Sequence, residues 1–184
     1  MNFKDYIFIF TLFSILLLAT LYPTTKPEFL EVSINVEENC TPDVVENEYE
    51  LFLDAIGHQE SGNRYNIVNR YGYMGRYQFG NSTLKTLKIK TTRKEFLNNT
   101  ILQEYAMYQH LQYNKKKLQK YIDKYEGKIV HGILVTESGL LAAAHLGGQG
   151  SVKKWFRTGK IRKDGNGVKI TSYMERFGGY DLSL

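Results

Sequence analysis

The chain has 184 residues, 42% of them hydrophobic and 23% charged, so it can bury the core of one domain and still carry a tail. Its formal net charge of +5 suits an anionic partner such as nucleic acid, a membrane surface or a bacterial cell wall, although a basic surface also serves solubility. Cys40 is the only cysteine, which excludes an internal disulfide and a cysteine-based metal site.

The first predicted element is an apolar stretch over residues 6–22, which contains no charged residue and follows Lys4. Its length lies at the lower limit for crossing a bilayer and at the upper limit for a signal-peptide core. Because no clear small-x-small cleavage site ends the stretch, we interpret residues 1–22 as an uncleaved anchor in the cytoplasmic membrane. A cleaved signal segment is the alternative. Lys4 favours a cytoplasmic N-terminus, so the rest of the chain is expected outside that membrane, anchored in the periplasm or exported.

Residues 23–47 have the composition of a linker, because all three prolines of the chain occur there among threonines and acidic residues. The folded domain is expected over residues 48–184. Since export would separate this domain from nucleic acid, we expect its anionic partner to belong to the cell envelope.

The domain is predicted to open with an amphipathic helix. Its apolar positions follow the i, i+3, i+4, i+7 spacing of one helix face: Tyr49, Phe52, Leu53 and Ile56. Glu60 lies four residues further on, continues that face and is followed by a helix-ending Gly62. Burial and the negative end of the helix dipole both disfavour a charged carboxylate at such a position, which suits a general acid. Glu60 is therefore the first candidate catalytic residue.

The remainder is predicted to be mainly α, because strand-like alternation is scarce. Further helices are expected over four segments: 81–87, 101–126, 136–146 and 171–177. Thr100 and Gln103 are expected to form the capping box of the longest of these helices, and Thr136 is expected to cap the next one. The tyrosine-, asparagine- and glycine-rich residues 63–80 predict a loop with at most one small β-hairpin. Glycines between residues 147 and 150 predict a tight turn.

Three short motifs follow one another along the domain: Glu60-Ser61, then Gly75 to Gln78, then the alanine- and glycine-rich segment 142–152. In this order and spacing they resemble the motifs of the lysozyme-like lytic transglycosylases, the peptidoglycan-cleaving domains of the soluble lytic transglycosylase type. Tyr173 is similar to a late helical tyrosine of that family. The resemblance covers roughly residues 48–180 and implies a lysozyme-like, α-rich (α+β) domain.

The resemblance also implies the reaction, which is cleavage of the β-1,4 bond between N-acetylmuramic acid and N-acetylglucosamine by one glutamate. Glu60 would protonate the glycosidic oxygen and then act as base on the muramyl 6-hydroxyl, leaving a 1,6-anhydro end. Five further residues are implied in substrate binding: Ser61, Tyr77, Gln78, His145 and Tyr173. The partner would be the peptidoglycan glycan strand, and no cofactor or metal ion is implied.

Two positions depart from the family pattern. The family usually has a Tyr-Asn pair where this chain has His145-Leu146, so a polar contact to substrate is lost or replaced by the imidazole. The family commonly has small apolar residues where Arg76 and Tyr77 stand, and an arginine there could suit anionic muramyl peptide stems.

Two alternatives remain open from the sequence. A hydrolysing muramidase of the same fold would need a second carboxylate to place water or to stabilise the oxocarbenium ion. The candidates for it are Asp54, Glu137, Asp164 and Asp181. A non-catalytic envelope-binding module would use Glu60 as a structural carboxylate instead, paired with Arg64, Arg70 or Arg76.

Overall fold

The computed structural model describes residues 47–184, all of which belong to the compact unit Val44–Leu184. The predicted anchor over residues 6–22, the linker and Cys40 lie outside the described residues. Within the described part of the chain, no helix combines the length and the apolar character needed to span a bilayer.

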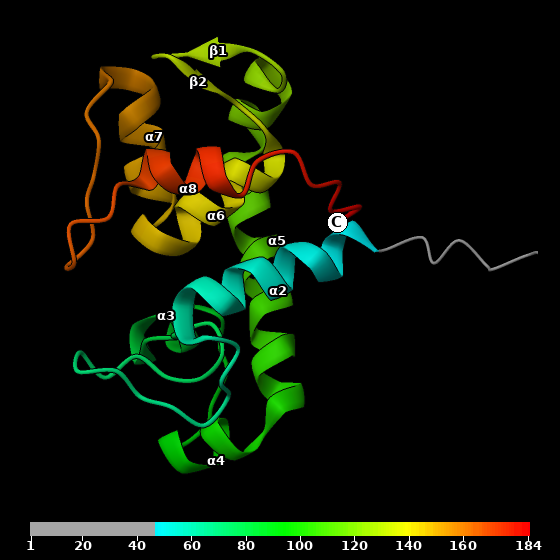
Figure 1. Ribbon diagram of the computed structural model, residues 1–184, viewed down its shortest axis with the longest axis vertical. Coiled ribbons are helices and arrows are strands. Elements are labelled where there is room, and N and C mark those ends of the chain that lie inside the picture. Colours follow the sequence, from blue (N-terminus) through cyan, green and yellow to red (C-terminus); the bar gives the residue numbers. More distant parts are fainter. Residues whose placement is uncertain (1–46) are drawn as a thin grey trace, which may run out of the picture. The chain divides into compact units, whose positions relative to one another are not determined.

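The described residues are mainly helical, as predicted (Figure 1). The helices are α2 (Glu48–Ser61), α3 (Asn81–Thr86), α4 (Arg93–Asn98), α5 (Thr100–Tyr125), α6 (Glu137–Gly147), α7 (Gln149–Thr158) and α8 (Ile170–Arg176). One antiparallel sheet of two strands, β1 (Ile129–Val130) and β2 (Ile133–Leu134), follows α5. A single small hairpin was expected, but its predicted place near residues 65–79 is wrong. That segment has only isolated bridges, because Gly75 and Gln78 have positive φ angles of 76° and 52° and turn the chain before a strand can form.

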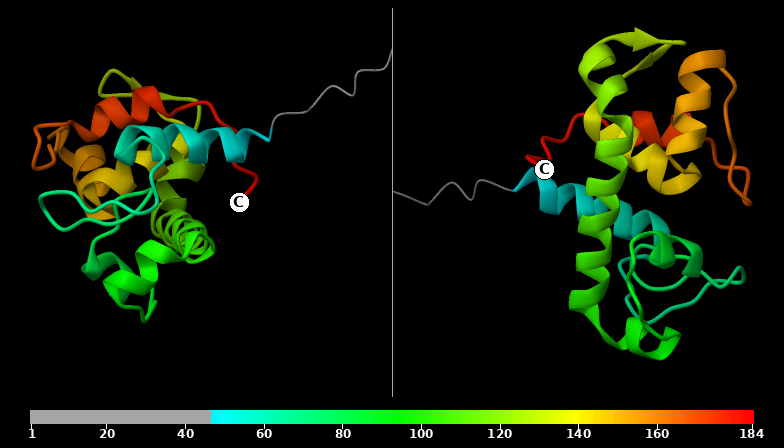
Figure 2. Two further views of the ribbon diagram at one scale, coloured as in Figure 1. Left: turned by 60° about the horizontal axis from the view of Figure 1, so that its bottom comes forward. Right: turned by 180° about the vertical axis from the view of Figure 1, so that it is seen from behind.

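Helix α2 forms as its sequence predicts. The Asn47 side chain caps it by accepting a hydrogen bond from the Tyr49 N–H at 3.1 Å, and Gly62 ends it with a φ of 64°. Phe52 and Ile56 are fully buried on the predicted apolar face. The last turn of this face carries Glu60, and α2 lies across the long helix α5 (Figure 2).

The predicted capping box of α5 is wrong. Asn99 caps this helix by accepting a hydrogen bond from the Leu102 N–H at 2.9 Å. Gln103 is fully buried and points into the fold. A capping box does form at the start of α4, between Thr92 and Glu95, a spacing that the sequence contains but that we did not predict.

Helix α6 is the centre of the second half of the domain, where it packs against α5, α7 and α8. Its three alanines, residues 142–144, are buried, and Thr136 caps it as predicted. The approach of α8 is so close that a Cβ at Gly139 would lie 2.6 Å from the Met174 carbonyl oxygen. The predicted glycine turn reduces to Gly148 with a φ of 79°, because α7 begins at the next residue.

Candidate active site

Glu60 occupies the last turn of α2, where its side chain is 16% exposed. Its Oε1 accepts a hydrogen bond at 2.7 Å from the hydroxyl of Tyr173, which α8 brings alongside. Among residues 47–184, Oε2 accepts no hydrogen bond and none of Arg64, Arg70 and Arg76 pairs with Glu60. One oxygen of the carboxylate is therefore held, and the other is available to carry a transferable proton.

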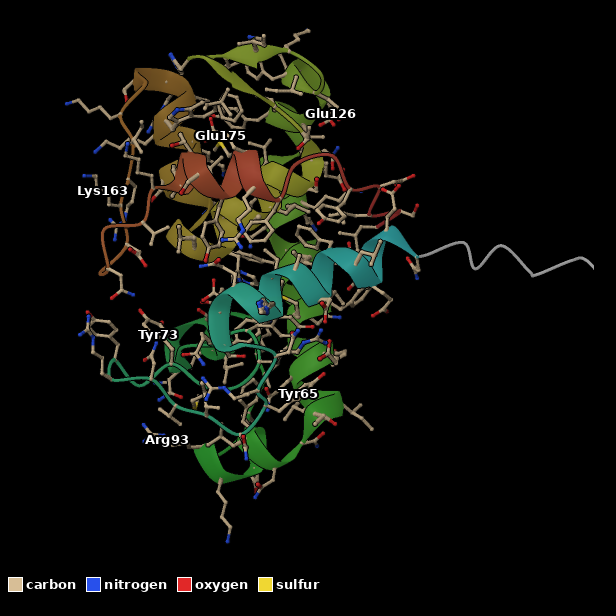
Figure 3. All side chains as sticks on the ribbon, in the orientation of Figure 1. Tyr65, Tyr73, Arg93, Glu126, Lys163 and Glu175 are labelled. Carbon is tan, nitrogen blue, oxygen red and sulfur yellow. The ribbon has the colours of Figure 1, made fainter. Side chains whose placement is uncertain are left out.

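Glu60 lines a cleft of about 380 Å³ between the two halves of the domain. The loop after α2, the start of α3, the end of α6 and the loop before α8 form its walls. Tyr71 and Tyr73 line it and are 51% and 45% exposed, and the Arg70 guanidinium covers one face of the Tyr71 ring at 4.7 Å from its centroid. Figure 3 shows Tyr73 on one side and the loop that carries Lys163 on the other. A cleft whose walls combine aromatic rings with many polar side chains suits a polar small-molecule or glycan ligand.

His145, at the end of α6, lines the cleft beside Glu60, with its Nε2 at 3.9 Å from the Glu60 Oε1. Burial lowers the pKa of His145, and the Glu60 carboxylate partly opposes that shift. The imidazole is therefore neutral near pH 7 and offers the cleft a polar group without a charge. Its Nδ1 has no hydrogen-bond partner among the described residues.

His110 lies behind His145, with the two ring centroids 5.3 Å apart. Asn114 is its one side-chain hydrogen-bond neighbour in the described chain, at 3.0 Å from Nε2. Burial, with a smaller contribution from His145, lowers the pKa of His110 to about 3.

The low pKa of His110 predicts a loss of stability in mild acid. Between the ordinary histidine pKa of 6.5 and about 3, the unfolded chain holds a proton that the native chain lacks. The free energy of unfolding therefore decreases as the pH is lowered through this range. Between about pH 7 and about pH 5, wild type should lose about 2 kcal/mol more unfolding free energy than His110→Gln. Chemical denaturation at both pH values measures this difference. A gap between the two proteins that does not change with pH would contradict the assignment.

The structure places Gln78 on the cleft and explains its conformation. The Gln78 side-chain amide donates a hydrogen bond to the Gly75 carbonyl at 2.8 Å across the turn. Gly75 must be glycine here, because its φ is 76° and a Cβ would lie 2.0 Å from the Gln103 Oε1. The Gln78 Oε1 accepts no hydrogen bond within the described chain, so it can accept one from a ligand.

Ser61 and Tyr77 do not line the cleft, which corrects the substrate contacts that we expected of them. The Ser61 hydroxyl donates to the Arg76 carbonyl at 2.8 Å and accepts from the Arg64 N–H at 2.9 Å. Tyr77 is fully buried, and its hydroxyl donates to the Glu104 Oε2 at 2.6 Å. Both residues attach the loop that carries Gln78 to the helices, so they position the site without touching substrate.

Arg76 does not face the cleft either, which corrects the expected contact with peptide stems. Its side chain is only 12% exposed, and its guanidinium pairs with Glu104 at 3.1 Å and with Asp54 at 3.3 Å. It also donates to the Asn63 Oδ1 at 2.9 Å. These contacts tie the loop to α2 and α5. The guanidinium therefore makes its hydrogen bonds within the protein and is not available to a ligand.

Gln103 supports the same loop, a role that the sequence did not indicate. Its Oε1 accepts from the Arg76 N–H at 2.9 Å. Its Nε2 donates to the Tyr65 carbonyl at 3.0 Å and to the Phe96 carbonyl at 2.8 Å. One buried amide thus satisfies two backbone groups of the loop and one of α4, and it ties the loop to that helix.

Of the four carboxylates considered for a hydrolase, only Asp164 lines the cleft with Glu60. Its Oδ1 accepts hydrogen bonds from the N–H groups of Asn166 and Val168, at 2.9 and 2.7 Å, and so holds its own loop. The other three lie elsewhere: Asp54 pairs with Arg76, Glu137 pairs with Lys115, and Asp181 lies in a pocket beside the C-terminus.

Two loops meet across the rim of the cleft. Arg70 donates to the Asn166 Oδ1 at 3.0 Å, and the Tyr71 hydroxyl lies 3.4 Å from the same oxygen. All three side chains are exposed, so these contacts are weak and can open for a ligand.

Comparison of the chain with family models, with curated proteins and with solved structures finds no match in any of the three. The residues of the cleft and the order of the motifs that carry them are therefore the basis for assigning a function.

Proposed function

We propose that the chain is a peptidoglycan glycosidase, a lytic transglycosylase of lysozyme-like (α+β) fold, in which Glu60 is the single acid and base. One observation carries the proposal: a partly exposed carboxylate with one oxygen held by Tyr173 and the other unbound, in the cleft that Gln78 and His145 line. The site belongs to the cell envelope in this proposal, with residues 6–22 as its anchor in the cytoplasmic membrane.

The geometry suits proton transfer in two directions. Glu60 gives its proton to the glycosidic oxygen as the bond from that oxygen to the muramyl C1 breaks. The resulting carboxylate then takes the proton of the muramyl 6-hydroxyl, whose oxygen closes onto C1 and leaves the 1,6-anhydro end. The substrate supplies the nucleophile, so no second carboxylate is needed. The unbound Oε1 of Gln78 can accept a hydrogen bond from an acetamido N–H group of the sugar.

The test of this proposal is digestion of purified insoluble peptidoglycan by the full chain. We expect soluble glycan fragments to be released at catalytic amounts of protein. Salt-sensitive binding to the wall with no fragments, even at equimolar protein, would instead identify a non-catalytic envelope-binding module.

A hydrolysing muramidase is the second candidate, because Asp164 shares the cleft with Glu60. In that reaction a water molecule attacks C1 and leaves a reducing end, with the second carboxylate positioning water or stabilising the oxocarbenium ion. The two hydrogen bonds that Asp164 accepts from its own loop already give it a structural task, so we rank this candidate second.

Tyr173 is predicted to position Glu60 for these transfers. Burial, followed by the charge of Glu60 and the hydrogen bond to it, raises the pKa of Tyr173 above its ordinary range, so its hydroxyl remains a donor at physiological pH. Tyr173→Phe removes that donor and should lower kcat about 5- to 30-fold, with little change in KM. Steady-state kinetics on soluble glycan measures the effect. Tyr180→Phe is the control, since the Tyr180 hydroxyl makes no hydrogen bond in the described chain, and an equal loss in both variants would contradict the role.

A further inference from the structure

A second concave surface lies on the other face of α3 from the Glu60 cleft. Gly80, Ser82 and Thr83 line the cleft, whereas Leu84 and Lys85 line a groove of about 720 Å³ between α3 and α4. The spacing of these residues along the helix places the two sets on opposite faces. A ligand that passes around α3 would therefore contact both surfaces.

The groove is lined by cations and by no acidic residue. Its charged side chains are Lys85, Lys88, Lys90 and Arg93, the last at the start of α4 (Figure 3), and we call this surface the cationic groove. The segment 81–94 contains five basic residues and no acidic one, a charge equal to the net +5 of the whole chain. None of these cations forms an ion pair with another residue of the described chain. Such a concentration of unpaired positive charge suits an anionic ligand.

The apolar part of the lining comes from Leu84, which is buried, and Ile89, which is partly buried. The ligand should therefore carry both carboxylates and small apolar groups. The peptide stem of peptidoglycan has this chemistry, because it alternates alanine methyl groups with free carboxylates. It is attached to the same muramyl residue whose glycosidic bond would lie at Glu60.

The reach of such a stem is comparable to the width of a helix. A helix with its side chains is about 10–12 Å across. An extended peptide advances about 3.3–3.6 Å per residue, so a stem of about four residues spans about 13 Å. It can leave the cleft beside Thr83 and place its carboxylates against Lys85 and Lys88.

We propose that the cationic groove binds the carboxylate-bearing peptide stem of the muramyl residue held in the Glu60 cleft. The substrate is then a glycan strand that still carries its stems. This inference rests on the proposed function. It also assigns to the groove the stem contact that Arg76, committed to Glu104 and Asp54, cannot make.

The test compares stem-bearing glycan with glycan whose stems have been removed by an amidase. The triple variant Lys85→Gln, Lys88→Gln, Lys90→Gln should raise KM for stem-bearing strands about 10-fold at low salt and leave kcat unchanged. Its KM for stem-free strands should equal that of wild type. The matched control is Lys116→Gln, Lys117→Gln, Lys120→Gln, which removes the same charge from exposed positions on α5 and should behave as wild type on both substrates.

Equal weakening of the triple variant on both substrates, or an equal effect in the control, would overturn the proposal, because either result indicates general attraction to an anionic wall. Binding of isolated stem peptide to the full chain gives a second readout that needs no catalysis. Wild type should bind this peptide in a salt-sensitive manner, and the triple variant should bind it about 10-fold more weakly. Failure of the proposed function would appear separately, as an absence of cleavage on both substrates. Absence of peptide binding by wild type would contradict the assignment of the groove and leave the proposed function unaffected.

Discussion

Glu60→Gln is expected to lower the rate of peptidoglycan cleavage by about 10²- to 10⁴-fold, the range that a general acid contributes. Glutamine keeps the size of the side chain, and its carbonyl oxygen can still accept the hydrogen bond of Tyr173, so the fold should not change. What disappears is the proton that Oε2 would deliver. The measurement is the initial rate of fragment release from purified wall by the full chain.

Glu175→Gln is the matched control for that experiment. Glu175 lies on α8, two residues from Tyr173, but it is exposed and does not line the cleft (Figure 3). It should retain the wild-type rate. A Glu60→Gln variant with more than about a tenth of wild-type activity would show that another group supplies the proton, since that loss is smaller than general acid catalysis provides.

Gln103→Leu is expected to cost about 3 kcal/mol or more of unfolding free energy. Leucine fills similar space but leaves the Arg76 N–H and the Tyr65 carbonyl without a partner. The Phe96 carbonyl keeps only the long hydrogen bond from the Asn99 N–H at 3.3 Å. Each unsatisfied buried group costs about 1–3 kcal/mol. The same change should lower activity, because the Gln78 turn loses its support.

Gln109→Leu is the comparison for the stability measurement. Gln109 is on the same helix and partly exposed, and it makes no hydrogen bond through its side chain in the described chain. Chemical denaturation of both variants should show a large loss for position 103 and less than about 0.5 kcal/mol for position 109. Similar losses at the two positions would contradict the assignment of Gln103 as the support of the loop.

The sequence predicts five of the helices, whereas α4 and α7 were not predicted. Apolar spacing predicts α2, Gly62 ends it, and Thr136 caps α6, because each signal acts within a few residues. Gln103 shows where this reasoning fails. A glutamine three residues after a threonine reads as a capping box, yet its amide is taken by backbone groups of Tyr65, Arg76 and Phe96. The start of its own helix and the backbone of the loop both offer the Gln103 amide hydrogen-bond partners, and only the tertiary fold decides between them.

The candidate site also contains residues that the sequence places in the cleft and residues that it does not. The motifs bring Glu60, Gln78 and His145 to one cleft, as expected of residues on that pattern. Ser61 and Tyr77 stand next to two of them in the sequence but point away from the cleft, because adjacent residues on a helix end or a tight turn face different directions. The position of Asp164 in the same cleft as Glu60 depends on how two distant loops meet, which no local signal encodes.

The chemical identity of the new glycan ends distinguishes a transglycosylase from a hydrolase. Wild-type full chain would digest purified peptidoglycan in water enriched in heavy oxygen, and mass spectrometry would analyse the released fragments. A single glutamate that activates the muramyl 6-hydroxyl predicts fragments that lack one molecule of water and carry no heavy oxygen at C1. Fragments with reducing ends that contain one heavy oxygen atom would contradict this account and would assign the reaction to a hydrolase that uses Glu60 with a second group.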